Sequence, residues 1–235
     1  MRNVSPIFVL ILTVCGISQP VVRAETITFD AARDWSDVSN PNGAWTYHGN
    51  NGSVLSTNQA DWDPNAHLLL RQRVWADDVM PRPGHVPAWF RVSEPSALDV
   101  VDVGMHGAES AVQAWIGISW RSPSDGKIRI AGGVWQALKT SNDGLQGNHR
   151  ERSSDWRLRL NDTILASGTV SGKDDFTSAS PYTFVSGAGG NALTDIVVDR
   201  GDNVVLEFIS PNSYSTFNGV DIRIHLDATA TADRP

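Results

Sequence analysis

The chain contains almost no cysteine. Cys15 is the only one among 235 residues, and it lies in an N-terminal segment that we expect to be removed. The mature chain would then have no disulfide and no thiol chemistry, so its stability must come from its core alone. Tyrosine is also scarce, with three residues, and the five glutamates follow no catalytic spacing. These shortages weaken the case for a polysaccharide lyase or a glycosidase.

Basic residues are outnumbered by acidic ones. The chain has 19 Lys and Arg against 26 Asp and Glu, a net charge of −7. Removal of residues 1–24 would take away Arg2 and Arg23 and bring the net charge to −9. No cluster of cations interrupts this acidic balance, which argues against nucleic acid as a partner. No apolar run after Ala24 is long enough to span a membrane, and we predict a monomer.

The first 24 residues have the pattern of a secretory signal peptide. Arg2 gives a positive start, residues 6–18 form a short apolar core, and Val22 and Ala24 occupy the small-residue positions that signal peptidase reads. We therefore predict cleavage after Ala24 and a secreted, periplasmic or extracellular location. The alternative is lipid attachment at Cys15, because the preceding "LTV" partly matches the motif for such attachment.

The remaining chain has the alternation of β-strands. Its apolar residues recur every second position in short runs separated by Gly, Pro, Asn, Asp and Ser, and no segment keeps a helical spacing for three turns. The clearest runs are 111–121, 127–135, 155–160, 163–170, 195–198, 203–210 and 219–227. This pattern predicts one all-β domain, an antiparallel β-sandwich over residues 25–226, with a flexible tail at 227–235. The Trp-rich stretch 34–95 has too few apolar residues to be a separate domain.

Several stretches together resemble a known domain. They are "NPNGAWTY" (40–47), "MHG" (105–107), "WRSPSDGKIRI" (120–130), "LNDTIL" (160–165) and "VDRGDNVVLEF" (198–208). In this order they resemble a β-sandwich domain of secreted bacterial proteins, of the kind sorted by the PEP-CTERM system, which looks like a carbohydrate-binding module. The resemblance implies a jelly-roll-like fold and an extracellular setting, and it implies no particular activity.

The stretch "WRSPSDGKIRIAGGVW" (120–135) predicts a β-hairpin closed by a loop at 122–126. The pairs would be Arg121 with Lys127, Ser119 with Arg129, Gly117 with Ala131, Trp115 with Gly133 and Gln113 with Trp135. Because side chains alternate along a strand, all these residues would share one face. The opposite face, which carries Ile116, Ile118 and Ile130, would face the core.

The shared face predicts a binding platform. Trp115 and Trp135 would border a floor of small residues, where a ligand can approach the backbone closely. A sugar ring could stack on either indole while polar neighbours bond its hydroxyl groups. The predicted ligand-binding residues are Trp115, Trp135, Arg129, Arg121 and Gln113, and the predicted partner is a polysaccharide or surface glycan. In the alternative, the N-terminal segment covers this face and fills the space.

Metal sites and catalytic sites have weaker signals. Aspartates at 61 and 63, at 77–78 and at 174–175 offer loop oxygens that suit calcium, although loop aspartates are more often turn residues. The six histidines show no zinc-binding spacing. The chain has no G-x-S-x-G motif and no phosphate-binding glycine loop. Glu207 points outward from its strand, the usual sign of a solvated carboxylate.

The sequence therefore predicts a non-catalytic, glycan-binding β-sandwich protein without a cofactor, calcium being the one metal left open. Two alternatives remain. One is a polysaccharide-active enzyme, a lyase or glycosidase, on the same fold. The other is a structural protein of the cell surface or extracellular matrix. Fold class alone does not separate the three.

Overall fold

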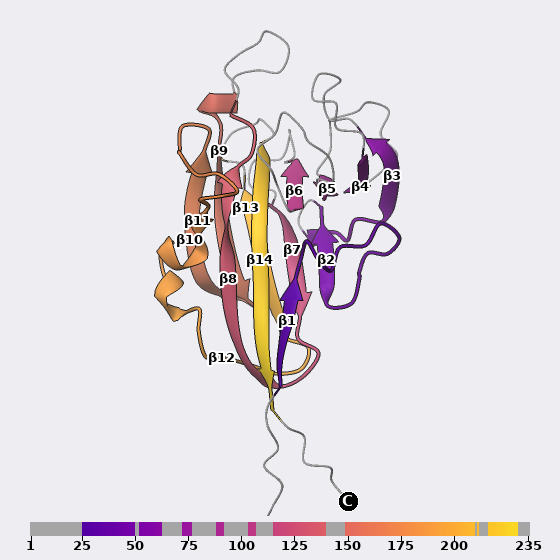
Figure 1. Ribbon diagram of the computed structural model, residues 1–235, viewed down its shortest axis with the longest axis vertical. Helices are drawn as coiled ribbons and strands as arrows, with labels where there is room; N and C mark the ends of the chain where they lie inside the picture. The colour runs from indigo at the N-terminus through magenta and orange to yellow at the C-terminus, as the bar shows by residue number, and fades with distance from the viewer. Residues whose placement is uncertain are drawn as a thin grey trace, which may run out of the picture.

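The computed structural model describes residues 25–49, 52–62, 72–76, 88–91, 103–106, 115–139, 149–209, 211 and 216–229. In this part the chain forms two antiparallel β-sheets that pack face to face, with single-turn 3-10 helices and no α-helix (Figure 1). The prediction of an all-β sandwich is confirmed. Within the same residues, no helix has the length and apolarity that a membrane span requires.

One sheet has nine strands among the described residues. Its main order is β11-β8-β14-β6-β5-β4-β3, with β1 on β14 and β12 on β8. The strands are β1 (Thr26–Asp30), β3 (Thr57–Trp62), β4 (Gln72–Ala76), β5 (Ala88–Phe90), β6 (Val103–His106), β8 (Gly126–Gln136), β11 (Tyr182–Thr183), β12 (Ile196–Val198) and β14 (Phe217–Ala228). The long strands β8 and β14 pair over eleven residues each and form its centre.

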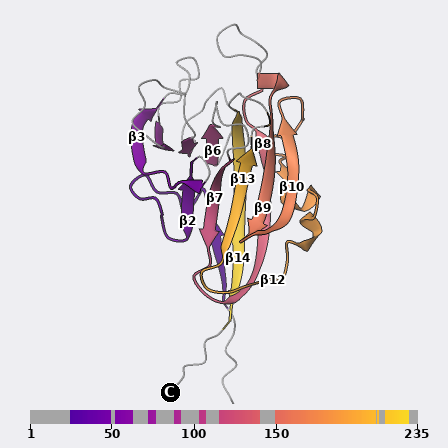
Figure 2. The same cartoon turned by 180° about the vertical axis from the view of Figure 1, so that it is seen from behind.

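The other sheet has five strands in the order β10-β9-β13-β7-β2. Figure 2 shows it from behind. Its strands are β2 (Trp45–His48), β7 (Trp115–Arg121), β9 (Ser153–Leu160), β10 (Thr163–Ser171) and β13 (Asn203–Ile209); the helical turns are η2 (His149–Glu151), η3 (Phe184–Ser186) and η4 (Gly190–Ala192). Where both are described, the strand bounds agree with the predicted runs to within two residues at each end. β14 ends at Ala228, inside the predicted tail.

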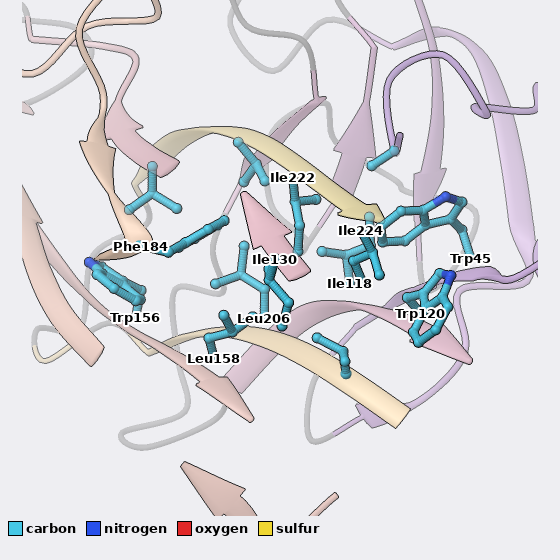
Figure 3. Close-up of a cluster of buried hydrophobic side chains, with 14 of the residues drawn as sticks. Trp45, Ile118, Trp120, Ile130, Trp156, Leu158, Phe184, Leu206, Ile222 and Ile224 are labelled. Carbon is cyan, nitrogen blue, oxygen red and sulfur yellow. The ribbon is translucent and has the colours of Figure 1, made fainter. Parts of the chain in front are cut away.

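The core lies between the sheets. Leu206 of β13 and Ile118 of β7 meet Ile130 of β8 and Ile222 of β14 there, and all four are at most 2% exposed (Figure 3). Burial of one such side chain contributes about 1.5–3 kcal/mol. The N-terminal strands add four aromatic residues to the same core, Trp45, Tyr47, Trp75 and Trp89. The predicted alternation is confirmed, because the residues between the core positions of β7 and β13 face outward.

The predicted hairpin is wrong. β7 pairs with β13 and β2 in the five-stranded sheet, whereas β8 pairs with β14, β11 and β12 in the nine-stranded sheet. Residues 122–125 therefore carry the chain from one sheet to the other. A connection of this kind between two sheets is called an arch. A hairpin and an arch have the same period-two pattern in sequence, because in both the apolar residues of each strand face the core. The outer rows of β7 and β8 consequently point to opposite sides of the molecule.

Gly132 and Gly133 of β8 allow neighbouring strands of the sheet to approach closely. Gly132 has φ of +117°, and a Cβ there would lie 1.9 Å from the carbonyl oxygen of Asp221. A Cβ on Gly133 would lie 2.4 Å from the carbonyl oxygen of Tyr182 in β11. The close approach that the glycines predicted is therefore present, but neighbouring strands make it instead of a ligand.

Candidate functional site

The four described residues of the predicted platform do not come together in one place. Trp135 is fully buried, and its ring lies over Gly219, where a Cβ would come within 2.1 Å of it. Arg129 is opposite His225 on the nine-stranded sheet, and Gln113 lies outside the described residues. Trp115 and Arg121 share the outer face of β7 in the five-stranded sheet. The platform bounded by two tryptophans is therefore wrong, and only its β7 side remains as a candidate surface.

That outer face carries a hollow of about 400 Å³, which we call the outer groove. It is lined by His48 of β2, Trp115 and Ser119 of β7, Arg159 of β9, Asn203 and Val205 of β13, and the β9–β10 turn residues Asn161 and Asp162. The register explains the grouping, since Val205 pairs with Ser119 on one side and with Arg159 on the other. Four strands from distant parts of the sequence thus build one surface.

Trp115 forms a partly exposed aromatic wall of the outer groove. Gly117, two residues further along β7, leaves room for the indole, since a Cβ there would lie 3.0 Å from its Cζ3. A Cβ on Gly52 would lie 2.7 Å from Cζ2 of the same ring. The N-terminal segment therefore packs against Trp115, as the alternative predicted, while its described residues leave the groove open.

His48 and Ser119 form a hydrogen-bonded pair in the groove. The distance from His48 Nε2 to Ser119 Oγ is 2.7 Å, and His48 Nδ1 lies 3.0 Å from the carbonyl oxygen of Gly52. The register of β2 on β7 makes this a diagonal pair, because His48 is opposite Gly117. Burial lowers the pKa of His48 below its usual value, and the hydrogen bond to Gly52 only partly opposes this. His48 is therefore neutral at neutral pH.

A buried carboxylate lies beside the groove. Glu207 of β13 is 1% exposed, and its oxygens contact Arg157 Nη2 at 3.1 Å and Arg159 Nη2 at 2.5 Å. The prediction of a solvated Glu207 is wrong, because two arginines of the neighbouring strand β9 cover it. Two guanidinium groups share one carboxylate, so this cluster keeps a net positive charge. It also holds the Arg159 side chain at the edge of the groove.

The position of β2, which carries His48, is fixed by two polar clusters. Asn40 donates from Nδ2 to the carbonyl oxygens of Tyr47 and Leu55, and its Oδ1 accepts from the Tyr47 N–H at 2.9 Å. These contacts hold β2 against the segment that follows it.

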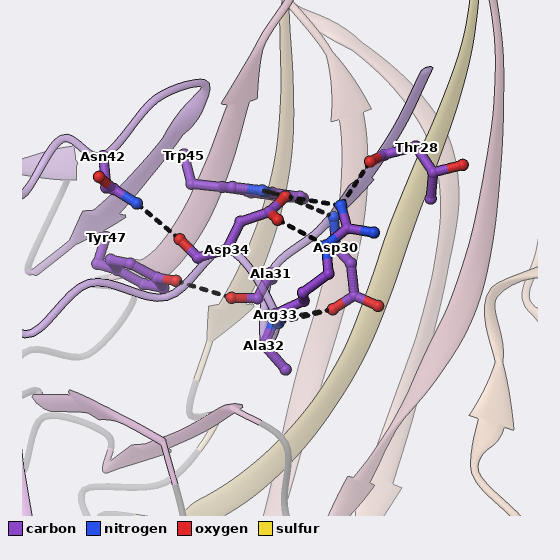
Figure 4. A network of polar contacts seen from close by, with 9 residues as sticks. All are labelled: Thr28, Asp30, Ala31, Ala32, Arg33, Asp34, Asn42, Trp45 and Tyr47. Carbon is purple, nitrogen blue, oxygen red and sulfur yellow. Dashed lines mark hydrogen bonds and ion pairs between the residues drawn. The ribbon is translucent and has the colours of Figure 1, made fainter. Parts of the chain in front are cut away.

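The second cluster links β2 to β1 through Asp34 (Figure 4). Asp34 accepts hydrogen bonds from Arg33 and the Trp45 indole, and the Tyr47 hydroxyl donates to the Ala31 carbonyl at 3.3 Å. Burial raises the pKa of Asp34, but its hydrogen bonds outweigh this and hold the pKa below its usual range. The "NPNGAWTY" stretch thus has a structural role next to the site.

A second hollow, of about 700 Å³, lies where the chain crosses between the sheets. Its lining includes Arg121 and Arg200, together with Phe29 and Pro123. The Arg121 guanidinium lies against Gly201. A Cβ added to this glycine would be 3.4 Å from Arg121 Nη2. Arg121 is therefore near a hollow, as the platform prediction required, but it is not one of the outer groove's lining residues.

The calcium prediction stays a prediction, because most of its aspartate side chains are not described. Asp174 accepts from the Ser171 backbone N–H at 2.7 Å and from its hydroxyl at 3.2 Å, which makes it a turn residue. Asp63, Asp77 and Asp78 lie outside the described residues. Across the described part of the chain, no group of three or more His, Cys, Asp or Glu residues is arranged to hold a metal ion.

Comparison with models of protein families, with curated proteins and with solved structures finds no match for this chain. The resemblance to a domain of secreted bacterial proteins therefore stays a prediction, as does the jelly-roll strand order. Sequence reasoning missed His48, Ser119, Arg157, Arg159 and Asn203, because strand order, which alternation does not predict, brings them together.

Proposed function

We propose that the protein is an exported glycan-binding β-sandwich protein, and that the outer groove binds the glycan. The observation that carries this proposal is an aromatic wall, Trp115, next to several hydrogen-bonding side chains in one hollow. Sugar rings present an apolar C–H face and a rim of hydroxyl groups, so they need both kinds of contact. Asn203 is exposed, and its hydrogen bonds with Asn161 use its backbone N–H and carbonyl, which leaves its side-chain amide available.

The charge near the groove favours a neutral or acidic glycan. Arg157 and Arg159 together exceed the single negative charge of Glu207. Arg159 also lines the groove, so it can donate to a hydroxyl or carboxylate oxygen of the ligand while Glu207 holds it in position. Hydrogen bonds from a guanidinium held in this way require little further ordering when the ligand binds.

A glycan-array screen of the mature protein, followed by titration of each hit, tests this function. Trp115→Ala should weaken binding by about 10- to 100-fold, the scale of stacking on one aromatic ring. Asn203→Ala should weaken it less. Arg129→Ala is the matched control, because it removes an exposed residue from the opposite sheet and should leave affinity unchanged. Absence of any hit, or equal loss in Trp115→Ala and Arg129→Ala, would contradict the proposal.

Export is the second part of the proposal, and it rests on the pattern of residues 1–24. Mass spectrometry of the protein recovered outside the cytoplasm should find Glu25 at its N-terminus. A chain that begins at a lipid-modified Cys15 would support the alternative of membrane attachment.

A further inference from the structure

We propose that Ser119 and His48 form a nucleophile–base pair that cleaves an ester bound in the outer groove. An activated serine needs a base within hydrogen-bonding distance and a third group that orients the base. Both are present: Nε2 of His48 lies 2.7 Å from Ser119 Oγ, and the Gly52 carbonyl lies 3.0 Å from Nδ1. No other side-chain contact holds the Ser119 hydroxyl among the described residues.

The contact with Gly52 fixes the tautomer of His48. A carbonyl oxygen can only accept a hydrogen bond, so Nδ1 must carry the proton. Nε2 is then the unprotonated nitrogen and accepts the hydrogen bond that the Ser119 hydroxyl donates. Burial, which lowers the pKa of His48, keeps the imidazole in this neutral form near pH 7. The ring is also held in place by Trp115, whose centroid is 6.1 Å away.

The reaction proceeds in two balanced stages. Ser119 Oγ attacks the carbonyl carbon of the ester, and its proton passes to Nε2 of His48. The ester C–O bond then breaks, and the leaving alcohol takes that proton, which leaves an acyl group on Ser119. Water next attacks the acyl carbonyl and gives a proton to His48, which returns it to Ser119 Oγ as the acid departs.

Positive charge is available for the oxyanion that forms. Arg159 lines the same groove as Ser119, and Val205 lies between the two in the sheet. Neighbouring strands are about 4.8 Å apart, so Arg159 starts about 10 Å from Ser119. Its side chain reaches β13, the strand between β9 and β7, where its Nη2 contacts Glu207. A cation near the developing negative charge stabilises the transition state.

The groove suggests the class of ester. A hollow of about 400 Å³ with one aromatic wall and several polar groups suits a short acyl chain on a hydroxyl-rich alcohol. We infer that the substrate is an O-acylated sugar, a choice that rests on the proposed glycan-binding function. The absence of a G-x-S-x-G motif is consistent with this site, because Ser119 lies within a strand and not on a strand-to-helix turn.

The test uses a fluorophosphonate probe, which labels activated serines and needs no glycan. The mature protein should be labelled, and mass spectrometry should locate the adduct on Ser119. Ser119→Ala and His48→Gln should each lose at least 90% of the labelling rate, with folding checked by thermal melting. Ser167→Ala is the matched control, because Ser167 lies on the same outer face opposite Arg157 and should not affect labelling.

An unlabelled mature protein, labelling that persists in Ser119→Ala, or equal labelling of a folded His48→Gln variant would overturn the proposal. Release of nitrophenol from p-nitrophenyl acetate gives a second readout, and it should be lost in the same two variants. The two proposals fail separately. A protein that binds glycans but takes no label refutes only the nucleophile, whereas a labelled protein that binds no glycan refutes only the proposed function.

Discussion

Glu207 shows how one residue can be on an outer face and still be buried. Its carboxylate is enclosed by Arg157 and Arg159 of β9, which remain partly exposed. The two guanidinium groups supply the opposite charge that a buried carboxylate needs in place of water. The cluster therefore contributes to stability and also sets the position of Arg159 in the groove.

Glu207→Gln should destabilise the protein by about 1–3 kcal/mol, because it leaves two guanidinium groups without their shared charge. Urea unfolding measures this loss. The matched control is Glu151→Gln, which removes an ion pair with Lys173 whose side chains are both more than half exposed. That change should cost less than about 1 kcal/mol. Equal costs for the two variants would show that burial of Glu207 contributes nothing.

His48 should make stability depend on pH. Its pKa is lowered in the folded protein, while in the unfolded chain it stays near 6.5. Between these two values the unfolded chain binds more protons, so the free energy of unfolding decreases as the pH falls from about 7 through this window. Melting temperatures from pH 8 to pH 5 should fall less steeply for His48→Gln than for the natural protein. Identical slopes would contradict the lowered pKa.

At the scale of elements, the register of β8 depends on a glycine. Gly132→Ala should be strongly destabilising, by about 3 kcal/mol or more, since it combines a positive φ with a Cβ 1.9 Å from the Asp221 carbonyl oxygen. Gly43→Ala is the control, because Gly43 has φ of +57° but no atom within 4 Å of the Cβ position. It should cost about 1–2 kcal/mol, the backbone strain alone. Thermal melting of both variants separates the cost of the steric clash at position 132 from the cost of backbone strain at a positive φ.

The link between β7 and β8 shows what alternation can and cannot predict. Period-two spacing correctly assigned Ile116 and Ile130 to the core and left Trp115 partly exposed, but it did not predict that Trp135 is fully buried. It could not say whether the strands pair, because a hairpin and an arch bury the same positions. The decision depends on the partners β13 and β14, which lie some 80 residues or more along the chain. Pairings this distant leave no signal in a local pattern.

The candidate site was predictable only in part for the same reason. Trp115 could be found because a large aromatic residue at an outward position, two residues from a glycine, suggests a surface contact. Asn161 and Asp162 could be recognised as a turn, and Asn161 does have a positive φ of 51°. The pairing of His48 with Ser119, however, depends on β2 joining the edge of the five-stranded sheet beside β7.

At the scale of the whole molecule, the two outer faces have different characters. On the nine-stranded sheet, Trp135 is fully buried and its ring packs on Gly219, so this tryptophan offers no accessible aromatic surface. On the five-stranded sheet, Trp115 stays partly exposed beside polar side chains from four strands. We therefore propose that the ligand binds only on the outer face of the five-stranded sheet.

The most direct test of this assignment is to map amide chemical-shift changes by NMR while a glycan from the array is added. The largest changes should occur at Gly117, Ser119, Asn203 and Val205, which line or underlie the outer groove. Amides of Ala131 and Arg223, on the outer face of the nine-stranded sheet, should stay unchanged. Changes concentrated at Ala131 and Arg223, with none around Ser119, would contradict the account.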